Sequence, residues 1–182
     1  MQRIIGAMSL FALAACASAP APAPTPVSSS MPAASSMASA SSMASASMTF
    51  QATLSPGDEV PPPKLDAGVQ PSGSATFTVS GTSIAYKVTA TGLSSAYAAA
   101  HIHAGAAGVA GPVLAALTLT PGAPGTASGE GTIDEAAIKG KNADGSTMSM
   151  DDLLAALKGG SAYVNVHTVN NKAGEARGQI TH

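Results

Sequence analysis

Short runs of alternating apolar and polar residues recur along most of the chain and predict β-strands. Glycine, serine, asparagine and proline, the residues that favour turns, separate these runs. In one run Ile84, Tyr86 and Val88 fall on the same face of a strand, because side chains alternate between the two faces. The expected strands are residues 50–54, 75–79, 84–89, 99–103, 113–119, 125–133, 162–168 and 177–181.

A single helical segment interrupts the strands. Ser149 is a suitable N-cap, two aspartates follow it in the first turn, and a glycine pair ends the segment after Lys158. The pattern therefore predicts a short helix over residues 151–158. Many short strands with one helix are typical of an all-β fold, so we expect an antiparallel β-sandwich of the immunoglobulin type over residues 49–182.

Residues 1–15 have the features of an export signal. Arg3 supplies a positive charge, and residues 4–13 supply an apolar run that is too short to span a bilayer. The sequence Leu-Ala-Ala-Cys that ends at Cys16 resembles the lipobox of bacterial lipoproteins, whose cysteine thiol receives a diacylglycerol. The resemblance implies cleavage before Cys16 and a lipid anchor in a membrane. The alternative is an ordinary secretory signal with a chance cysteine beside the cleavage site.

The segment from residue 16 to residue 48 is a low-complexity linker. Alternating prolines between residues 20 and 26 favour an extended conformation, and a repeat of serine, alanine and methionine follows them. This composition cannot bury a core, so it predicts a disordered tether that spans on the order of 30 Å. The methionines could also serve as soft copper ligands, but we favour a simple repeat of small residues.

Charge and cysteine content narrow the functional classes. The net charge is −2 and lysine and arginine form no run, so nucleic acid is not an expected partner. Cys16 is the only cysteine of the chain, so the domain over residues 49–182 must fold without a disulfide. Beyond residues 4–13, which are themselves too short, no apolar run is long enough to cross a membrane. The lipid anchor is therefore the expected link to the membrane, and Ala17 in place of an aspartate favours the outer membrane.

Three of the four histidines lie in predicted strands. His101 and His103 are two positions apart, which places both imidazoles on one face of a strand. His167 has the same kind of position in residues 162–168, where it shares a face with Tyr163 and Asn165. If these strands are neighbours, the three imidazoles could converge on copper or zinc with one position left open. The alternative is that the histidines are outward polar residues, or hydrogen-bonded residues that fix loops.

Charged residues near both ends of the domain form the remaining candidates. Glu175, Arg177 and Gln179 share one face of the last predicted strand. Arg177 could attract an anion, or it could hold Glu59 or Glu175 in a salt bridge. The sequence contains no nucleophile elbow, Walker loop or dinucleotide fingerprint, which favours a non-enzymatic module.

Several ordered segments resemble the CHRD domain, which is named after chordin and is widespread in bacterial secreted proteins. These segments are residues 59–62, 100–105, 111–113, 163–168 and 174–180. The resemblance extends from about Phe50 to Ile180, nearly the whole predicted domain. It implies an extracytoplasmic binding module that acts in the cell envelope on an undefined protein or polysaccharide ligand.

The order of the histidines is also similar to that of Cu,Zn superoxide dismutases, which are β-sandwiches. His101, His103 and His167 follow the order of three copper ligands, and Arg177 follows the order of the arginine that guides superoxide. No histidine lies between His103 and His167, and the disulfide of that family has no counterpart. This similarity implies a copper or zinc site with a redox role as the alternative function.

Overall fold

Nine β-strands and one α-helix lie within residues 47–182, the part of the chain that the computed structural model describes. The predicted leader (1–15), Cys16 and nearly all of the predicted tether (16–48) lie outside these residues. The elements are β1 (Met48–Leu54), β2 (Ser72–Ser80), β3 (Ser83–Thr91), β4 (Tyr97–Ala104), β5 (Val113–Leu117), β6 (Thr120–Pro121), β7 (Ala127–Ile133), α1 (Met150–Lys158), β8 (Ala162–Thr168) and β9 (Ala176–Gln179), with single 3-10 turns at Pro56–Asp58 and Glu135–Ala137.

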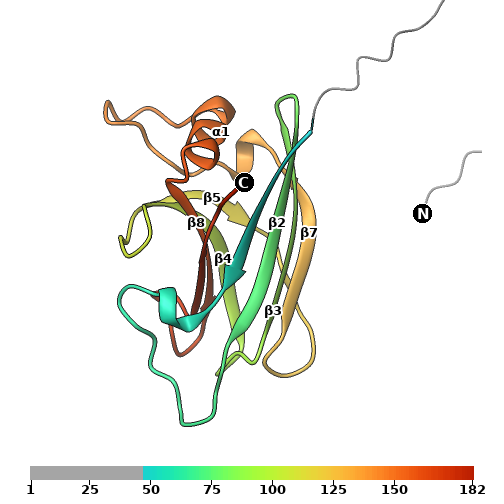
Figure 1. The fold of residues 1–182 in the computed structure, drawn as a ribbon, viewed down its shortest axis with the longest axis vertical. Coiled ribbons are helices and arrows are strands. Elements are labelled where there is room, and N and C mark those ends of the chain that lie inside the picture. The colour runs from blue at the N-terminus through green and yellow to red at the C-terminus, as the bar shows by residue number, and fades with distance from the viewer. Residues whose placement is uncertain (1–46) are drawn as a thin grey trace, which may run out of the picture. The chain divides into compact units, whose positions relative to one another are not determined.

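The strands form two sheets that face each other (Figure 1). One sheet has the order β1-β2-β3-β7-β6, and the other has the order β5-β4-β8-β9. Every pair of neighbouring strands is antiparallel. The predicted all-β antiparallel sandwich with one helix is therefore confirmed.

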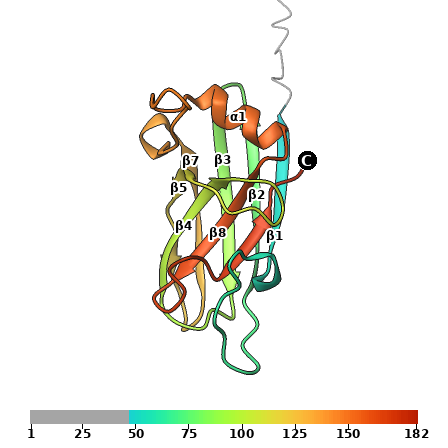
Figure 2. The same cartoon turned by 90° about the vertical axis from the view of Figure 1, so that its left-hand side faces the viewer.

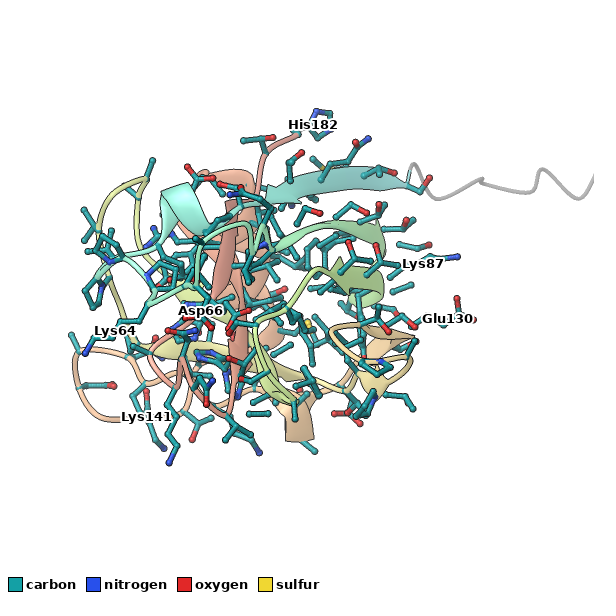
Figure 3. The ribbon with its side chains drawn as sticks, turned by 90° about the horizontal axis from the view of Figure 1, so that it is seen from below. Lys64, Asp66, Lys87, Glu130, Lys141 and His182 are labelled. Carbon is teal, nitrogen blue, oxygen red and sulfur yellow. The ribbon has the colours of Figure 1, made fainter. Side chains whose placement is uncertain are left out.

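The core fills the space between the sheets with alternate residues of each strand. Phe50, Phe77 and Tyr86 form a row across β1, β2 and β3, and Phe77 is fully buried. Within residues 47–182 the only salt bridge joins Lys87 to Glu130 at 3.9 Å on the outer face of this sheet, where both side chains project into solvent (Figure 3). Both side chains are more than two-thirds exposed, so this pair contributes little stability.

Helix α1 covers one end of the sandwich (Figure 2). Its N-terminus has a capping box, in which the side chains of Ser149 and Asp152 each bind the backbone N–H of the other residue. The helix buries Leu153 and Leu157 completely or nearly so. The predicted helix is confirmed, and it begins one residue earlier than expected. None of the helices within residues 47–182 is long and apolar enough to cross a membrane.

Two predicted strands are longer than the observed ones because the chain changes sheets between them. β5 ends at Leu117, and the chain crosses to the other sheet, where Thr120 pairs with Ser128. Backbone groups of Thr118 at the crossing both bind the Tyr86 hydroxyl, at 3.0 and 3.2 Å. Gly125 then turns the chain with a positive φ of 75°, a conformation that suits glycine, so β7 begins only at Ala127.

Loops cover the outer face of the four-stranded sheet, which is the face turned away from the five-stranded sheet. The β4–β5 loop (residues 105–112), the β8–β9 loop (residues 169–175) and the segment around Glu59 all contact side chains on this face. As a result every residue of β8 is buried, including the polar ones. The polar side chains of this face lie under loops rather than in solvent.

Candidate metal centre

The register of β4 and β8 places three histidines on one covered face. His101 is directly opposite Asn165, and His167 is opposite Ala99, so His101 and His167 are diagonal neighbours. Ile102 lies between the β4 histidines and is fully buried in the core on the other face. The alternation expected from the sequence therefore holds on both strands.

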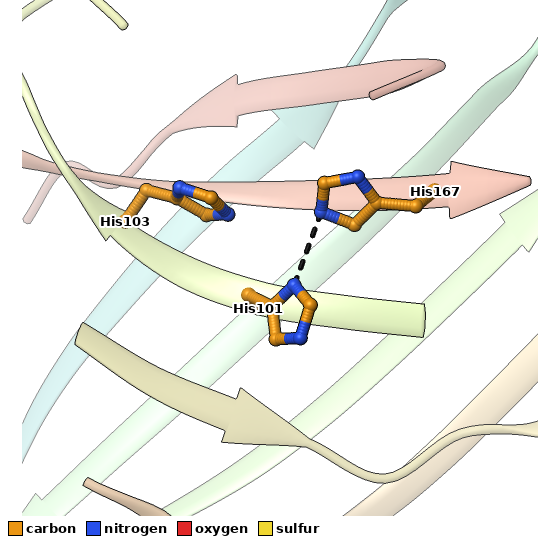
Figure 4. A group of neighbouring side chains, drawn as sticks. All are labelled: His101, His103 and His167. Atoms are coloured by element: carbon orange, nitrogen blue, oxygen red, sulfur yellow. Dashed lines mark hydrogen bonds between the residues drawn. The ribbon is translucent and has the colours of Figure 1, made fainter. Parts of the chain in front are cut away.

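The three imidazoles converge (Figure 4). One ring nitrogen from each of His101, His103 and His167 lies within 4.8 Å of the other two. His101 Nδ1 is 3.1 Å from His167 Nε2, and the ring centroids are 5.0 to 5.7 Å apart. Imidazole nitrogens at about 2.0–2.1 Å from one metal would be roughly 3.5 Å apart, so a movement of about 1 Å would close the site.

Backbone carbonyls fix the orientation of two of these rings. His103 Nδ1 is 3.0 Å from the carbonyl oxygen of Gly111, and His167 Nδ1 is 3.1 Å from that of Lys172. A carbonyl oxygen only accepts, so each Nδ1 carries the proton and each Nε2 presents a lone pair. His167 Nε2 accepts a hydrogen bond from His101 Nδ1, which therefore carries the proton of that ring in the metal-free cluster. His103 Nε2 is buried and has no hydrogen-bond partner within residues 47–182. This arrangement is the usual one for metal-binding histidines.

Burial keeps the three imidazoles neutral at neutral pH. Desolvation, with further repulsion from His101 and His103, lowers the pKa of His167 to about 4. Desolvation also lowers the pKa of His101 and of His103, assisted by His103 in the first case and by Arg177 in the second. Neutral imidazoles have the free lone pair that a metal ligand needs, so the cluster can bind a cation at neutral pH. His101 is only partly buried and forms the open side of the cluster.

Arg177 is almost completely buried, but it does not form the predicted salt bridge. Within the described part of the chain neither Glu59 nor Glu175 is within ion-pair distance of its guanidinium. Its Nη2 donates to the carbonyl oxygens of Ala106 and Val109, at 2.8 and 3.0 Å. Of the two alternatives for Arg177, the salt bridge is therefore not found within residues 47–182, because the β4–β5 loop supplies the acceptors. The guanidinium carbon lies 3.4 Å from the centroid of the Tyr163 ring, which adds a cation–π contact.

Glu59 is buried beside this face without a strong partner. Its Oε2 accepts a hydrogen bond of 3.3 Å from Asn165 Nδ2, while its Oε1 has no partner among the described residues. Desolvation raises the pKa of Glu59 to about 7, although Arg177 and Asn165 act to lower it. This carboxyl is therefore close to half-protonated at neutral pH.

Glu175 is fully buried and satisfied by hydrogen bonds instead of a cation. Its carboxylate accepts from the backbone and hydroxyl of Ser94, both at 2.5 Å, from Thr168 Oγ1 at 2.5 Å and from Asn171 Nδ2 at 2.7 Å. Burial acts to raise the pKa of Glu175, but these hydrogen bonds outweigh it and hold the pKa below its ordinary value. Glu175 is therefore an anion that holds three segments together.

The structure also identifies neighbours to which the sequence assigned no role. Tyr163 stacks on His103 with 5.1 Å between ring centroids, and its hydroxyl accepts from the backbone N–H of Gly111. The sequence indicated the positions of Tyr163 and Asn165, because alternation places them on the same face of the strand as His167. The sequence could not indicate the carbonyl groups of Gly111 and Lys172 as partners of the histidines, because every residue has a carbonyl group.

Comparison with known proteins places the chain in a family without adding a solved relative. Neither the curated proteins nor the solved structures contain a match, so the similarity to superoxide dismutases receives no support from them. A family model of the CHRD domain matches residues 50–180. This match covers more than half of the chain and includes all three clustered histidines, and it supports an extracellular binding-type module. The chain therefore belongs to the CHRD domain family.

Proposed function

We propose that this chain is a lipid-anchored envelope module that binds a copper or zinc ion through His101 Nδ1, His103 Nε2 and His167 Nε2. His101 Nδ1 donates to His167 Nε2 in the metal-free cluster, so the proton of the His101 ring moves to its Nε2 when the metal binds. The observation that carries the proposal is the convergence of three neutral imidazoles within 4.8 Å, two of them oriented by backbone carbonyls. The metal takes the place of the undefined ligand that the CHRD resemblance implies.

Unmet hydrogen bonding favours a metal over a purely structural cluster. The only hydrogen bond between the rings goes from His101 Nδ1 to His167 Nε2, and the buried Nε2 of His103 has no partner within residues 47–182. A buried polar atom without a partner costs about 1–3 kcal/mol. A bound cation would accept lone pairs from all three rings at once and would remove this cost.

The donor set favours copper over zinc. All three donors are neutral nitrogens, and sites of this type bind Cu²⁺ more tightly than Zn²⁺. The cluster contains no carboxylate or thiolate from residues 47–182, so a fourth position stays open on the side of His101. When bound, the metal supplies a Lewis acid or a one-electron centre at this position, and the protein residues orient it and limit access of water.

Metal titration tests the proposal with a matched control. We would titrate Cu²⁺ and Zn²⁺ into residues 17–182, which omit only the predicted leader and the lipidated cysteine. The double variant His101→Ala, His167→Ala should bind at least 100-fold more weakly than the wild type. The variant His182→Ala, which removes the exposed fourth histidine, should bind one equivalent as the wild type does. Equal binding by the double variant and the wild type would reject the site.

The lipid anchor requires a separate test. Residues 1–16 support cleavage before Cys16 and acylation of its thiol, because the signal has a short apolar run and small residues before the cysteine. The full chain should fractionate with the outer membrane, and Cys16→Ser should release it or leave it unprocessed. A Cys16→Ser protein that is processed and stays in the membrane fraction would contradict lipidation.

A further inference from the structure

Two buried charged residues at the start of β9 are neighbours of the histidine cluster and have no ion pair among the described residues. Glu175 directly precedes β9, and Arg177 lies within it. The two side chains are at most 1% exposed. A buried charge without a counter-ion is costly, so its hydrogen bonds indicate what it stabilises.

Arg177 stabilises the loop that orients His103. Its two hydrogen bonds go to carbonyl groups of Ala106 and Val109 in the β4–β5 loop, and Gln179 Nε2 adds a third to Gly105 at 3.0 Å. The same loop reaches Gly111, whose carbonyl accepts from His103 Nδ1. A Cβ on Gly111 would lie 1.8 Å from the carbonyl oxygen of Ala104, so the loop is pressed closely against β4 at this point.

Glu175 stabilises the loop that orients His167. Its carboxylate accepts from Thr168 and from Asn171, which lie on either side of the turn in the β8–β9 loop. Ser94 fixes the carboxylate from a third segment through two further hydrogen bonds. Lys172, whose carbonyl accepts from His167 Nδ1, directly follows Asn171.

We propose that Arg177 and Glu175 are positioning residues of the metal centre, with Arg177 acting on His103 and Glu175 acting on His167. Each acts through one loop and one carbonyl, which keeps the proton on Nδ1 and directs the lone pair of Nε2 into the cluster. An imidazole of the opposite tautomer would direct an N–H bond at the metal position and could not bind it. The inference rests on the proposed function for its purpose, but the effect on each tautomer can be measured without metal.

The test compares the two effects in one experiment. Two-bond ¹H–¹⁵N correlation spectra of metal-free residues 17–182 at pH 8 distinguish protonated from unprotonated ring nitrogens. Arg177→Met should convert His103 to a mixture of tautomers and leave His167 unchanged, whereas Glu175→Gln should do the reverse. The matched substitutions Lys87→Met and Glu130→Gln, at the exposed salt bridge of the other sheet, should change neither ring. Equal changes of both rings in both variants, or no change in either, would overturn the inference.

Conservative substitutions keep the test decisive if the first pair does not fold. Arg177→Lys retains the charge but reduces the number of hydrogen bonds, and Glu175→Asp retains the charge but shortens the side chain. The lysine variant should therefore change the tautomer of His103 alone, and the aspartate variant that of His167 alone, each to a smaller extent than in the first pair. Absence of these changes in the folded variants would also overturn the inference.

Metal affinity separates this inference from the proposed function. Loss of a group that orients a ligand typically weakens metal binding 10–100-fold, so Zn²⁺ binding should fall by this factor in Arg177→Met and in Glu175→Gln. If the wild type binds no metal but each variant changes the tautomer of its own histidine, the proposed function is rejected and the positioning roles are kept. Weaker binding with unchanged tautomers would reject the positioning roles alone.

Discussion

Glu59→Gln should make the domain more stable at pH 8, although it removes a charged side chain from a protein with few of them. Glu59 is 4% exposed, and its Oε1 has no partner within residues 47–182. A glutamine keeps an acceptor for Asn165 Nδ2, and its amide can donate to Asn165 Oδ1, which is also unpartnered in the described region. The substitution therefore removes a costly negative charge and keeps the shape.

The pKa of Glu59 sets the size and the sign of the effect. Its pKa rises from 4.5 in the unfolded chain to about 7 in the folded domain, which corresponds to about 3 kcal/mol. Below pH 4.5 the carboxyl is protonated in both states, and ionisation costs nothing. Between pH 4.5 and 7 the unfolded state ionises first, so wild-type stability falls as the pH rises. Above pH 7 the whole cost is present, and a glutamine avoids it.

Urea denaturation of residues 17–182 at pH 4, 6 and 8 measures this difference. The free energy of unfolding of Glu59→Gln should equal that of the wild type at pH 4 and exceed it by up to about 3 kcal/mol at pH 8. The control Glu130→Gln, which changes an exposed carboxylate, should differ from the wild type by less than about 0.5 kcal/mol at each pH. If Glu59→Gln gained no stability relative to the wild type between pH 4 and pH 8, the reasoning on burial would be refuted.

Three further predictions concern stability. In the Glu59→Gln background the free energy of unfolding should fall by about 3 kcal/mol as the pH drops from 6.5 to 4, because burial lowers the pKa of His167 to about 4 and the unfolded state binds the proton more readily. Adding His167→Gln should flatten this pH profile. A profile that His167→Gln leaves unchanged would contradict the assignment to His167. Leu153→Ala, at a fully buried position of α1, should cost about 2–5 kcal/mol in urea denaturation, and a loss under 1 kcal/mol would mean that α1 is not part of the cooperative core. Ser149→Ala removes the capping box and should lower the unfolding free energy by about 0.5–2 kcal/mol, and an unchanged midpoint would argue against the cap.

The alternation of apolar and polar residues along each strand was sufficient to predict most of the fold and to place His101 and His103 on one face of their strand. The strand over residues 162–168 was predicted with its observed bounds, and alternation placed Ile102 in the core and His101 and His103 on the opposite face. These features depend on the local chain alone, because a strand exposes successive side chains on opposite faces.

The environment of that face was not predictable from the same pattern. An alternation of polar and apolar residues suggests a solvated outer face, whereas loops cover it and bury Asn165 and His167. The partners of Arg177 are backbone carbonyls in a distant loop, and backbone groups carry no signature in the sequence. The sequence therefore indicated that Arg177 needs hydrogen-bond acceptors, but it did not indicate which segment of the chain supplies them.

The diagonal pairing of His101 with His167 has a topological consequence. These residues are 66 positions apart in the chain, and one ion bound to both would close a loop of that length. In the chain-entropy treatment of crosslinks, a loop of this size restricts the unfolded ensemble by about 4 kcal/mol. A domain whose only cysteine precedes it can thus gain from a coordinate bond the kind of long-range closure that disulfide-bonded domains obtain by oxidation.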